Sequence, residues 1–163
     1  MSKRQIFYSF HFANDAMRVQ QIRNIGALED NKPVSENQWE DIKRKGDNAI
    51  KRWIDDNMRY RSCVIVLIGK ETAESKWVQY EIQKAWEDNK GLFGIYIHNL
   101  KCPKNGKCLK GPNPFDLFEF SDGTKLSSFI TCYNPNPEDA YSDISTHLES
   151  WVEKAIEEAN NRR

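Results

Sequence analysis

The sequence predicts an α/β fold, with one mostly parallel sheet of about five strands and helices on both faces. Two observations support this prediction. Strand-like and helix-like segments alternate along the chain, which is the order that α/β folds show. The run Cys63–Ile68 is apolar at every position, and such runs are typical of strands that helices cover on both faces. A chain of 163 residues is long enough for its own core, so a single domain over 1–163 is expected.

Four segments have the length and residue types of strands. They are 6–12, 63–68, 91–97 and 128–133. In open parallel sheets, ligands bind outside the carboxyl ends of the strands. The loops after Phe12, Ile68 and Ile97 are therefore expected to carry the functional residues.

Apolar residues at helical spacing predict four helices. They run from an N-cap at Asn14-Asp15 to Gly26, from Gly46 to Met58, from Ser75 to about Asp88, and from Asn136-Pro137 to a charged end at 157–163. Two stretches lack a clear pattern. Residues 27–45 predict a long mobile loop around Trp39, and residues 98–127 predict an elaborated loop because they are rich in Gly, Pro, Asn and Lys.

The composition excludes several classes of partner. The 24 basic and 24 acidic side chains cancel, so the basic excess that favours a nucleic-acid partner is missing. A net charge of zero is compatible with a homo-oligomer. No apolar run approaches the roughly 20 residues that span a bilayer, and a signal-peptide core is absent. We therefore expect a cytoplasmic protein with no membrane partner. Cys102 and Cys108 are spaced too widely for a zinc knuckle, so unpaired thiols and no metal site are expected.

Glu81 occupies an unexpected place on the predicted third helix. On a wheel of about 100° per residue, it falls inside the apolar arc of Trp77, Val78, Ile82, Ala85 and Trp86. A carboxylate there is desolvated, paired, or at the lip of a pocket. Two interpretations stay open, a helix-edge glutamate whose stem packs against the core, or a functional acid, because perturbed carboxylates concentrate at functional sites.

The surroundings of Glu81 resemble a known family. Arg61–Gly69 places Arg-Ser before an apolar strand, and Ser75-x-Trp77-Val-x-x-Glu81 follows it; TIR domains have Ser-x-Trp-Cys-x-x-Glu after such a strand. Ile6–His11 is similar to their opening strand. More narrowly, six segments resemble the ThsB-type TIR-like family that supplies the sensor of bacterial Thoeris anti-phage systems: Ser9–Phe12, Gln21–Asn24, Lys51–Ile54, Ile68–Thr72, Gly94–Asn99 and Gly111–Phe115.

The resemblance implies a flavodoxin-like, TIR-like sheet and an enzyme. Enzymatic TIR domains cleave the nicotinamide–ribose bond of NAD, their substrate, with no separate cofactor, and the glutamate at the position of Glu81 is catalytic. In Thoeris systems the TIR-like protein responds to a phage-derived trigger by making a cyclic or conjugated ADP-ribose signal, which a separate effector protein binds. The chemistry agrees with this role: nicotinamide leaves as a neutral molecule and needs no general acid, and one carboxylate can stabilise the positive charge that develops on the ribose.

Four further residues are the predicted substrate-binding set: Phe10, His11, Trp77 and Trp39. Phe10 and His11 end the first strand, where an aromatic ring can stack on nicotinamide or adenine; the alternative for His11 is a hydrogen bond within its loop. Trp77 lines either the pocket or the core. Trp39 is a lid or an assembly contact, in the stretch that corresponds to the mobile BB loop of TIR domains.

The polar residues of the first helix and the following loop have weaker signals. Arg18, Arg23 and Lys43 could meet the pyrophosphate of a dinucleotide, although a solvated surface role is the ordinary alternative for each. Asp15 is interpreted as the cap of the first helix rather than as a ligand contact.

Two alternatives compete with an NAD enzyme. The first is a non-catalytic TIR-like scaffold that acts by homotypic assembly. The second is a receiver or flavin-binding module on the same fold, since this fold hosts unrelated functions. A receiver would need acidic residues where Phe10 and His11 stand and a phospho-accepting aspartate where Gly69 stands, so this alternative is disfavoured. The sequence favours the enzyme over the scaffold through Glu81 and its context.

Overall fold

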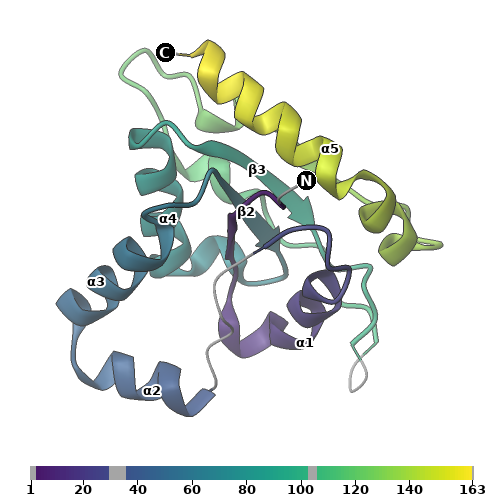
Figure 1. The fold of residues 1–163 in the computed structure, drawn as a ribbon, viewed down its shortest axis with the longest axis horizontal. Coiled ribbons are helices and arrows are strands. Elements are labelled where there is room, and N and C mark those ends of the chain that lie inside the picture. The colour runs from purple at the N-terminus through teal and green to yellow at the C-terminus, as the bar shows by residue number, and fades with distance from the viewer. Residues whose placement is uncertain (1–2, 30–35, 103–105, 163) are drawn as a thin grey trace.

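The computed structural model describes residues 3–29, 36–102 and 106–162. Four parallel strands form one sheet in the order β1-β2-β3-β4 (Figure 1). They are β1 (Ile6–Ser9), β2 (Cys63–Ile68), β3 (Gly91–Tyr96) and β4 (Cys132–Tyr133). The predicted mostly parallel α/β sheet is thus confirmed, with four strands against the expected number of about five.

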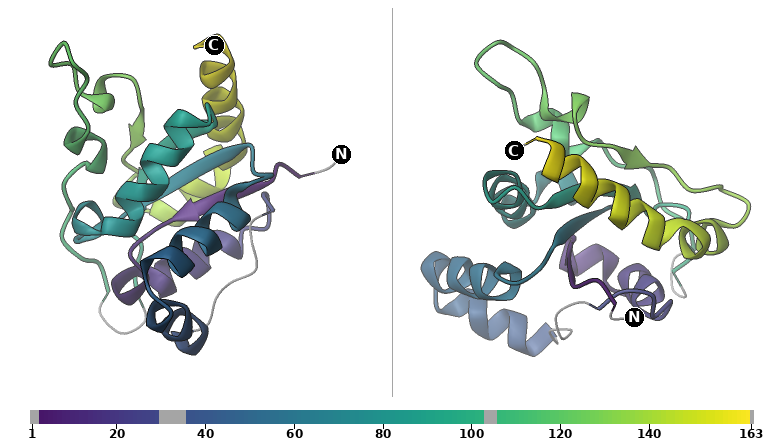
Figure 2. Two further views of the ribbon diagram at one scale, coloured as in Figure 1. Left: turned by 90° about the vertical axis from the view of Figure 1, so that its left-hand side faces the viewer. Right: turned by 45° about the horizontal axis from the view of Figure 1, so that its top comes forward.

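The described part of the chain contains five α-helices. They are α1 (Phe12–Arg23), α2 (Glu36–Arg44), α3 (Asp47–Met58), α4 (Lys76–Glu87) and α5 (Ala140–Asn161). Apolar residues of α1 and α5 share one core cluster, and those of α3 and α4 share the other. Figure 2 shows α5 across one face of the sheet, with α3 and α4 across the opposite face.

The central strand β2 explains why the sheet needs helices on both sides. Cys63, Ile65 and Leu67 belong to the cluster with α1 and α5, whereas Val64, Val66 and Ile68 belong to the cluster with α3 and α4. Because successive side chains of a strand point to opposite faces, both sets are buried. The interpretation of this run as a strand covered on both faces is confirmed.

The first strand is shorter than predicted. β1 ends at Ser9, and α1 begins at Phe12 with His11 as its N-cap. The predicted N-cap at Asn14-Asp15 is therefore wrong. Asp15 is inside the first turn with only 1% of its surface exposed, and its carboxylate lies 3.7 Å from the Arg18 guanidinium. Asp15 thus faces a buried partner within its own helix and does not cap the helix.

The prediction of a continuous loop over residues 27–45 is wrong. This stretch contains α2, in which Trp39 and Ile42, three residues apart, pack toward the α3–α4 cluster. Residues 30–35 of the predicted loop, among them Pro33 and Ser35, lie outside the described residues, so its predicted mobility is untested there. The helix escaped prediction because these two apolar residues are its whole apolar stripe, while charged residues dominate the rest.

The C-terminal half differs from prediction in two boundaries. Two short 3₁₀ helices, Pro114–Leu117 and Leu126–Ser128, occupy the long loop, and the second shortens the predicted strand 128–133 to Cys132–Tyr133. Residues 103–105 of that loop lie outside the described part. α5 begins at Ala140 because Asp139 accepts a hydrogen bond from the Ser142 amide at 3.1 Å, so the predicted start at Asn136-Pro137 is too early. Over the described residues, no helix is long and apolar enough to cross a membrane.

Candidate functional site

A cleft of about 240 Å³ opens at the carboxyl end of β1. All five residues singled out from the sequence, Phe10, His11, Trp39, Trp77 and Glu81, line it. Phe10 and His11 come from the short link between β1 and α1, Trp39 from α2, and the other two from α4. The alternation of strands and helices along the chain brings them to the carboxyl end of the sheet, where parallel sheets bind their ligands.

Glu81 lies at the base of this cleft and is 7% exposed. Its Oε1 accepts a hydrogen bond of 2.7 Å from the Ser9 hydroxyl of β1. Burial raises the pKa of the Glu81 carboxyl to about 8, and the hydrogen bond from Ser9 opposes that rise. A carboxyl group with such a pKa is largely protonated at neutral pH, and a positive charge beside it favours its ionisation.

The start of α4 fixes the position of Glu81. Ser75 is the N-cap, and its hydroxyl accepts a hydrogen bond of 3.3 Å from the Val78 amide. From there Val78, Ile82 and Ala85 turn into the core, and Glu81 is the charged residue of the same buried face. Trp77 lines the cleft while its ring packs edge-on against Tyr80 at 6.0 Å. Trp77 thus contributes to the pocket wall and to the helix surface together.

A chain of aromatic rings forms one wall of the cleft. Phe10 stacks on Phe12 with ring centroids 6.2 Å apart, Phe12 lies 6.4 Å from Trp39, and Trp39 meets Trp53 of α3 edge-on at 5.8 Å. All four residues line the cleft. Flat apolar walls of this kind suit the aromatic rings of a nucleotide.

Basic side chains stand at the cleft as well. The Arg23 guanidinium lies 5.6 Å from the Phe10 ring and 6.0 Å from the Tyr8 ring. Lys43 of α2 also lines the cleft, and its ammonium pairs with Glu40 at 2.7 Å. Arg18 is elsewhere: it is buried and donates hydrogen bonds to the carbonyls of Leu100 at 2.9 Å and Gly106 at 2.8 Å. Of the three predicted pyrophosphate contacts, the structure therefore places two at the cleft.

His11 lines the cleft, and Asp15 lies four residues further along the chain, outside the lining. The Nδ1 atom of His11 is buried and lacks a hydrogen-bond partner among the described residues. Burial raises the pKa of the Asp15 carboxyl, and the charges of Arg18 and His11 oppose that rise. The structure thus puts His11 in the lining of the cleft and buries Asp15 outside that lining.

Ser9 is a site residue that was not predicted from the sequence, although its hydroxyl donates directly to the Glu81 carboxyl. A signal was present, because alternation along β1 puts Ser9 on the same face as Phe7, the face that meets α3 and α4. Tyr8, Phe12 and Trp53 also line the cleft. Only the folded arrangement shows which helix each of them meets.

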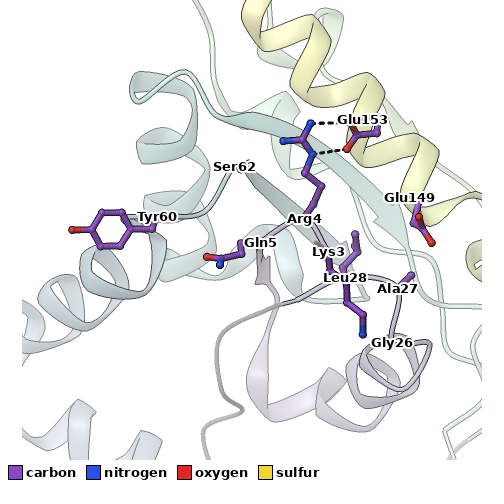
Figure 3. A pocket seen from close by; sticks show the side chains of 10 residues that line it. All are labelled: Lys3, Arg4, Gln5, Gly26, Ala27, Leu28, Tyr60, Ser62, Glu149 and Glu153. Carbon is purple, nitrogen blue, oxygen red and sulfur yellow. Dashed lines mark hydrogen bonds and ion pairs between the residues drawn. The ribbon is translucent and has the colours of Figure 1, made fainter. Parts of the chain in front are cut away.

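A larger hollow of about 940 Å³ lies at the opposite edge of the sheet (Figure 3). Arg4, Gln5 and Ser62, which precede β1 and β2, help to line it. Its Arg4 guanidinium makes two hydrogen bonds, of 2.7 and 2.9 Å, to the Glu153 carboxylate, and both side chains are about half exposed. Arg4 and Glu153 thus neutralise each other in a solvent-exposed ion pair, whereas Glu81 is a desolvated acid. The smaller cleft is therefore the candidate site.

Two comparisons with known proteins agree on the kind of domain. The family described as "Thoeris protein ThsB, TIR-like domain" matches residues 7–102. A protein of Bacillus cereus (strain MSX-D12), named "Putative cyclic ADP-D-ribose synthase ThsB1", is 37% identical over 134 residues, which cover 77% of this chain and 69% of that protein. The segment matched by the family contains Ser9, Glu81 and both tryptophans predicted to contact substrate.

Proposed function

This chain belongs to the family of TIR-like domains of the Thoeris protein ThsB, and we propose that it is an anti-phage enzyme that cleaves NAD and makes a cyclic or conjugated ADP-ribose. The observation that carries this proposal is Glu81, a buried carboxyl at the base of an aromatic-walled cleft. The family membership and the name of the Bacillus cereus relative support the same reaction class.

The reaction needs a carboxylate and little else at the bond that breaks. The C–N bond between ribose and nicotinamide breaks, and its electron pair leaves with nicotinamide, which departs neutral. The ribose becomes an oxocarbenium-like cation, and ionised Glu81 stabilises that developing charge. A nucleophile of the same molecule then forms a bond to the cationic ribose carbon and closes a ring, or an outside alcohol or water forms that bond, releases its proton to solvent and gives the conjugated or hydrolysed product.

The cationic nicotinamide ring itself prepares Glu81 for this role. Burial raises the pKa of Glu81 to about 8. A positive charge within a few ångströms in a site of low dielectric favours the carboxylate form. Substrate binding therefore ionises the acid at the moment when its charge is needed, and the empty protein avoids a buried unpaired charge.

The remaining lining residues orient the dinucleotide. Phe10, Trp39 and Trp77 offer ring faces or edges to nicotinamide, and Arg23 and Lys43 supply positive charge for the pyrophosphate. Pockets that enclose drug-sized ligands span roughly 300–1,000 Å³. A cleft of about 240 Å³ therefore holds the nicotinamide riboside end of NAD. The adenosine end extends beyond Arg23 and Lys43.

The wider role that family membership suggests belongs to the same proposal. The product acts as a diffusible signal in the cytoplasm for a separate effector protein, and a phage-derived trigger switches the enzyme on. Self-association of the chain is one way for such a trigger to act.

The test is incubation with NAD and chromatographic separation of the nucleotides, with and without phage lysate. Wild type is expected to release nicotinamide, and Glu81→Gln is expected to lose that activity by a factor of at least a hundred. Glu87→Gln is the matched control, because it is the same change at an exposed position of the same helix. If wild type stays silent with concentrated protein and lysate alike, the non-catalytic scaffold is the better description.

A further inference from the structure

Ser9 is a buried hydroxyl at the end of an otherwise apolar strand. The other residues of β1, Ile6, Phe7 and Tyr8, are buried hydrophobic side chains, and Ser9 is 0% exposed. A buried hydroxyl costs free energy unless it is hydrogen-bonded. Its donated bond of 2.7 Å to Glu81 Oε1 meets that need and joins residues 72 positions apart.

The sheet makes Ser9 a rigid donor. Ser9 pairs in register with Val66 of the central strand, and alternation directs its side chain to the face that meets α4. Glu81 comes to it from a helix whose buried neighbours Val78 and Ile82 are locked in the core. Both partners are thus held by regular structure, which limits the rotation of the Glu81 carboxyl.

The other charged groups near α4 either pair with residues other than Glu81 or are exposed to solvent. Asp55 of α3 accepts a hydrogen bond from Tyr80 at 2.7 Å and lies 3.8 Å from the Lys84 ammonium. Glu74, just before α4, is exposed. β2 presents apolar side chains to α4. The groups that share the cleft with Glu81 are His11, Arg23 and Lys43.

We propose that Ser9 is a positioning residue for the NAD-cleaving reaction: its hydroxyl holds the Glu81 carboxyl at the base of the cleft and stabilises its ionised form. This inference rests on the proposed function of Glu81. A hydroxyl that donates to a carboxylate favours the charged state over the neutral acid. Ser9 therefore shares control of the Glu81 charge with the substrate cation.

Ser9→Ala removes the donor and leaves the strand apolar. Because hydrogen bonds to charged groups are strong, we expect kcat at neutral pH to fall about tenfold or more, with a smaller change in KM. The acid limb of the pH–rate profile moves to higher pH, and the deficit against wild type narrows as pH rises. A merely structural serine would give a deficit that does not depend on pH.

Two further variants separate donor loss from packing. Ser9→Thr keeps the hydroxyl and suits a strand, so it is expected to restore most of the wild-type profile. Ser9→Cys replaces the hydroxyl with a larger thiol that is only a weak S–H donor, so its acid limb is expected between those of wild type and Ser9→Ala. If Ser9→Ala does not fold, the comparison of the Thr and Cys variants decides the question.

A measurement without NAD distinguishes the two proposals. The stability difference between wild type and Glu81→Gln, followed by urea unfolding across pH, reports the titration of Glu81, and the same difference is measured in the Ser9→Ala background. If the pH midpoint of the Glu81 titration is higher in the Ser9→Ala background, the result supports the control of Glu81 by Ser9, even if no NAD cleavage is found. If wild type cleaves NAD but Ser9→Ala shifts neither the pH midpoint of the Glu81 titration nor the pH–rate profile, the inference is overturned and the proposed function stands.

Discussion

Trp39 of α2 meets Trp53 of α3 edge-on, with ring centroids 5.8 Å apart, and the two rings close one side of the cleft above Glu81. The same Trp39 ring lies 6.4 Å from Phe12 at the start of α1. One side chain thus connects α2 to α1 and to α3. α2 is in contact with α3, so Trp39 both anchors this helix and forms the wall.

Replacing Trp39 with alanine is expected to weaken substrate binding. Stacking of a base on an aromatic ring contributes about 1–3 kcal/mol, so KM for NAD should rise about tenfold with a smaller change in kcat. Trp86→Ala is the control: Trp86 packs against Phe120 at 5.7 Å, away from the cleft lining, and its loss should lower stability with KM unchanged. Equal KM values for both variants would remove Trp39 from the substrate contacts.

The position of Glu81 was predictable because it depends on local periodicity alone. Twelve residues of α4 fix which side chains share a face, and the buried set Val78, Glu81 and Ile82 follows from that spacing. The two-sided burial of β2 was predictable for the same reason. Local sequence does not contain the approach of α4 to β1, and so the partnership of Glu81 with Ser9 became visible only in the fold.

Arg18 and α2 show the opposite case. The partners of Arg18 are the carbonyls of Leu100 and Gly106, which every residue type offers equally, so no motif announces them. α2 carries charged residues around Trp39 and Ile42, and its packing on α3 outweighs its weak helical pattern. Tertiary contacts decided both features.

Lys43 is expected to assist binding through its charge. Lys43→Gln should raise KM for NAD by about threefold to tenfold at low salt, because a basic group near a pyrophosphate attracts it. The effect should shrink in 0.5 M salt. Arg44→Gln removes the same charge one position further along α2, where Arg44 pairs with Asp41 at 2.9 Å outside the cleft lining. The steady-state KM of the two variants, measured at both salt concentrations, decides whether position or overall charge matters.

Gly69 follows β2 and leaves room for Asp15. A Cβ added there would stand 2.7 Å from Asp15 Cγ, and Asp15 is held in place by burial and by Arg18. Gly69→Ala is therefore expected to cost about 1–3 kcal/mol in the free energy of unfolding. In the Asp15→Ala background the same change should cost less, since the clashing carboxyl is gone. Additive losses in urea unfolding of the single and double variants would show that the two residues are independent.

Glu81→Gln is expected to stabilise the protein at neutral and alkaline pH while it abolishes activity. The folded-state pKa of Glu81 is about 8 against an ordinary value of 4.5, so between these values the folded protein binds more protons than the unfolded chain. By linkage, wild-type stability then falls as pH rises through this window.

Glutamine does not titrate and keeps the shape of the protonated acid, so the variant is free of this loss. At pH 5 the two proteins should have similar stability, and at pH 8.5 the variant should be more stable by a few kcal/mol, since each pKa unit corresponds to about 1.4 kcal/mol. Urea unfolding at several pH values measures the gap. Parallel stability curves would mean that water or a basic group reaches the Glu81 carboxylate, and the acid would then be charged before substrate arrives.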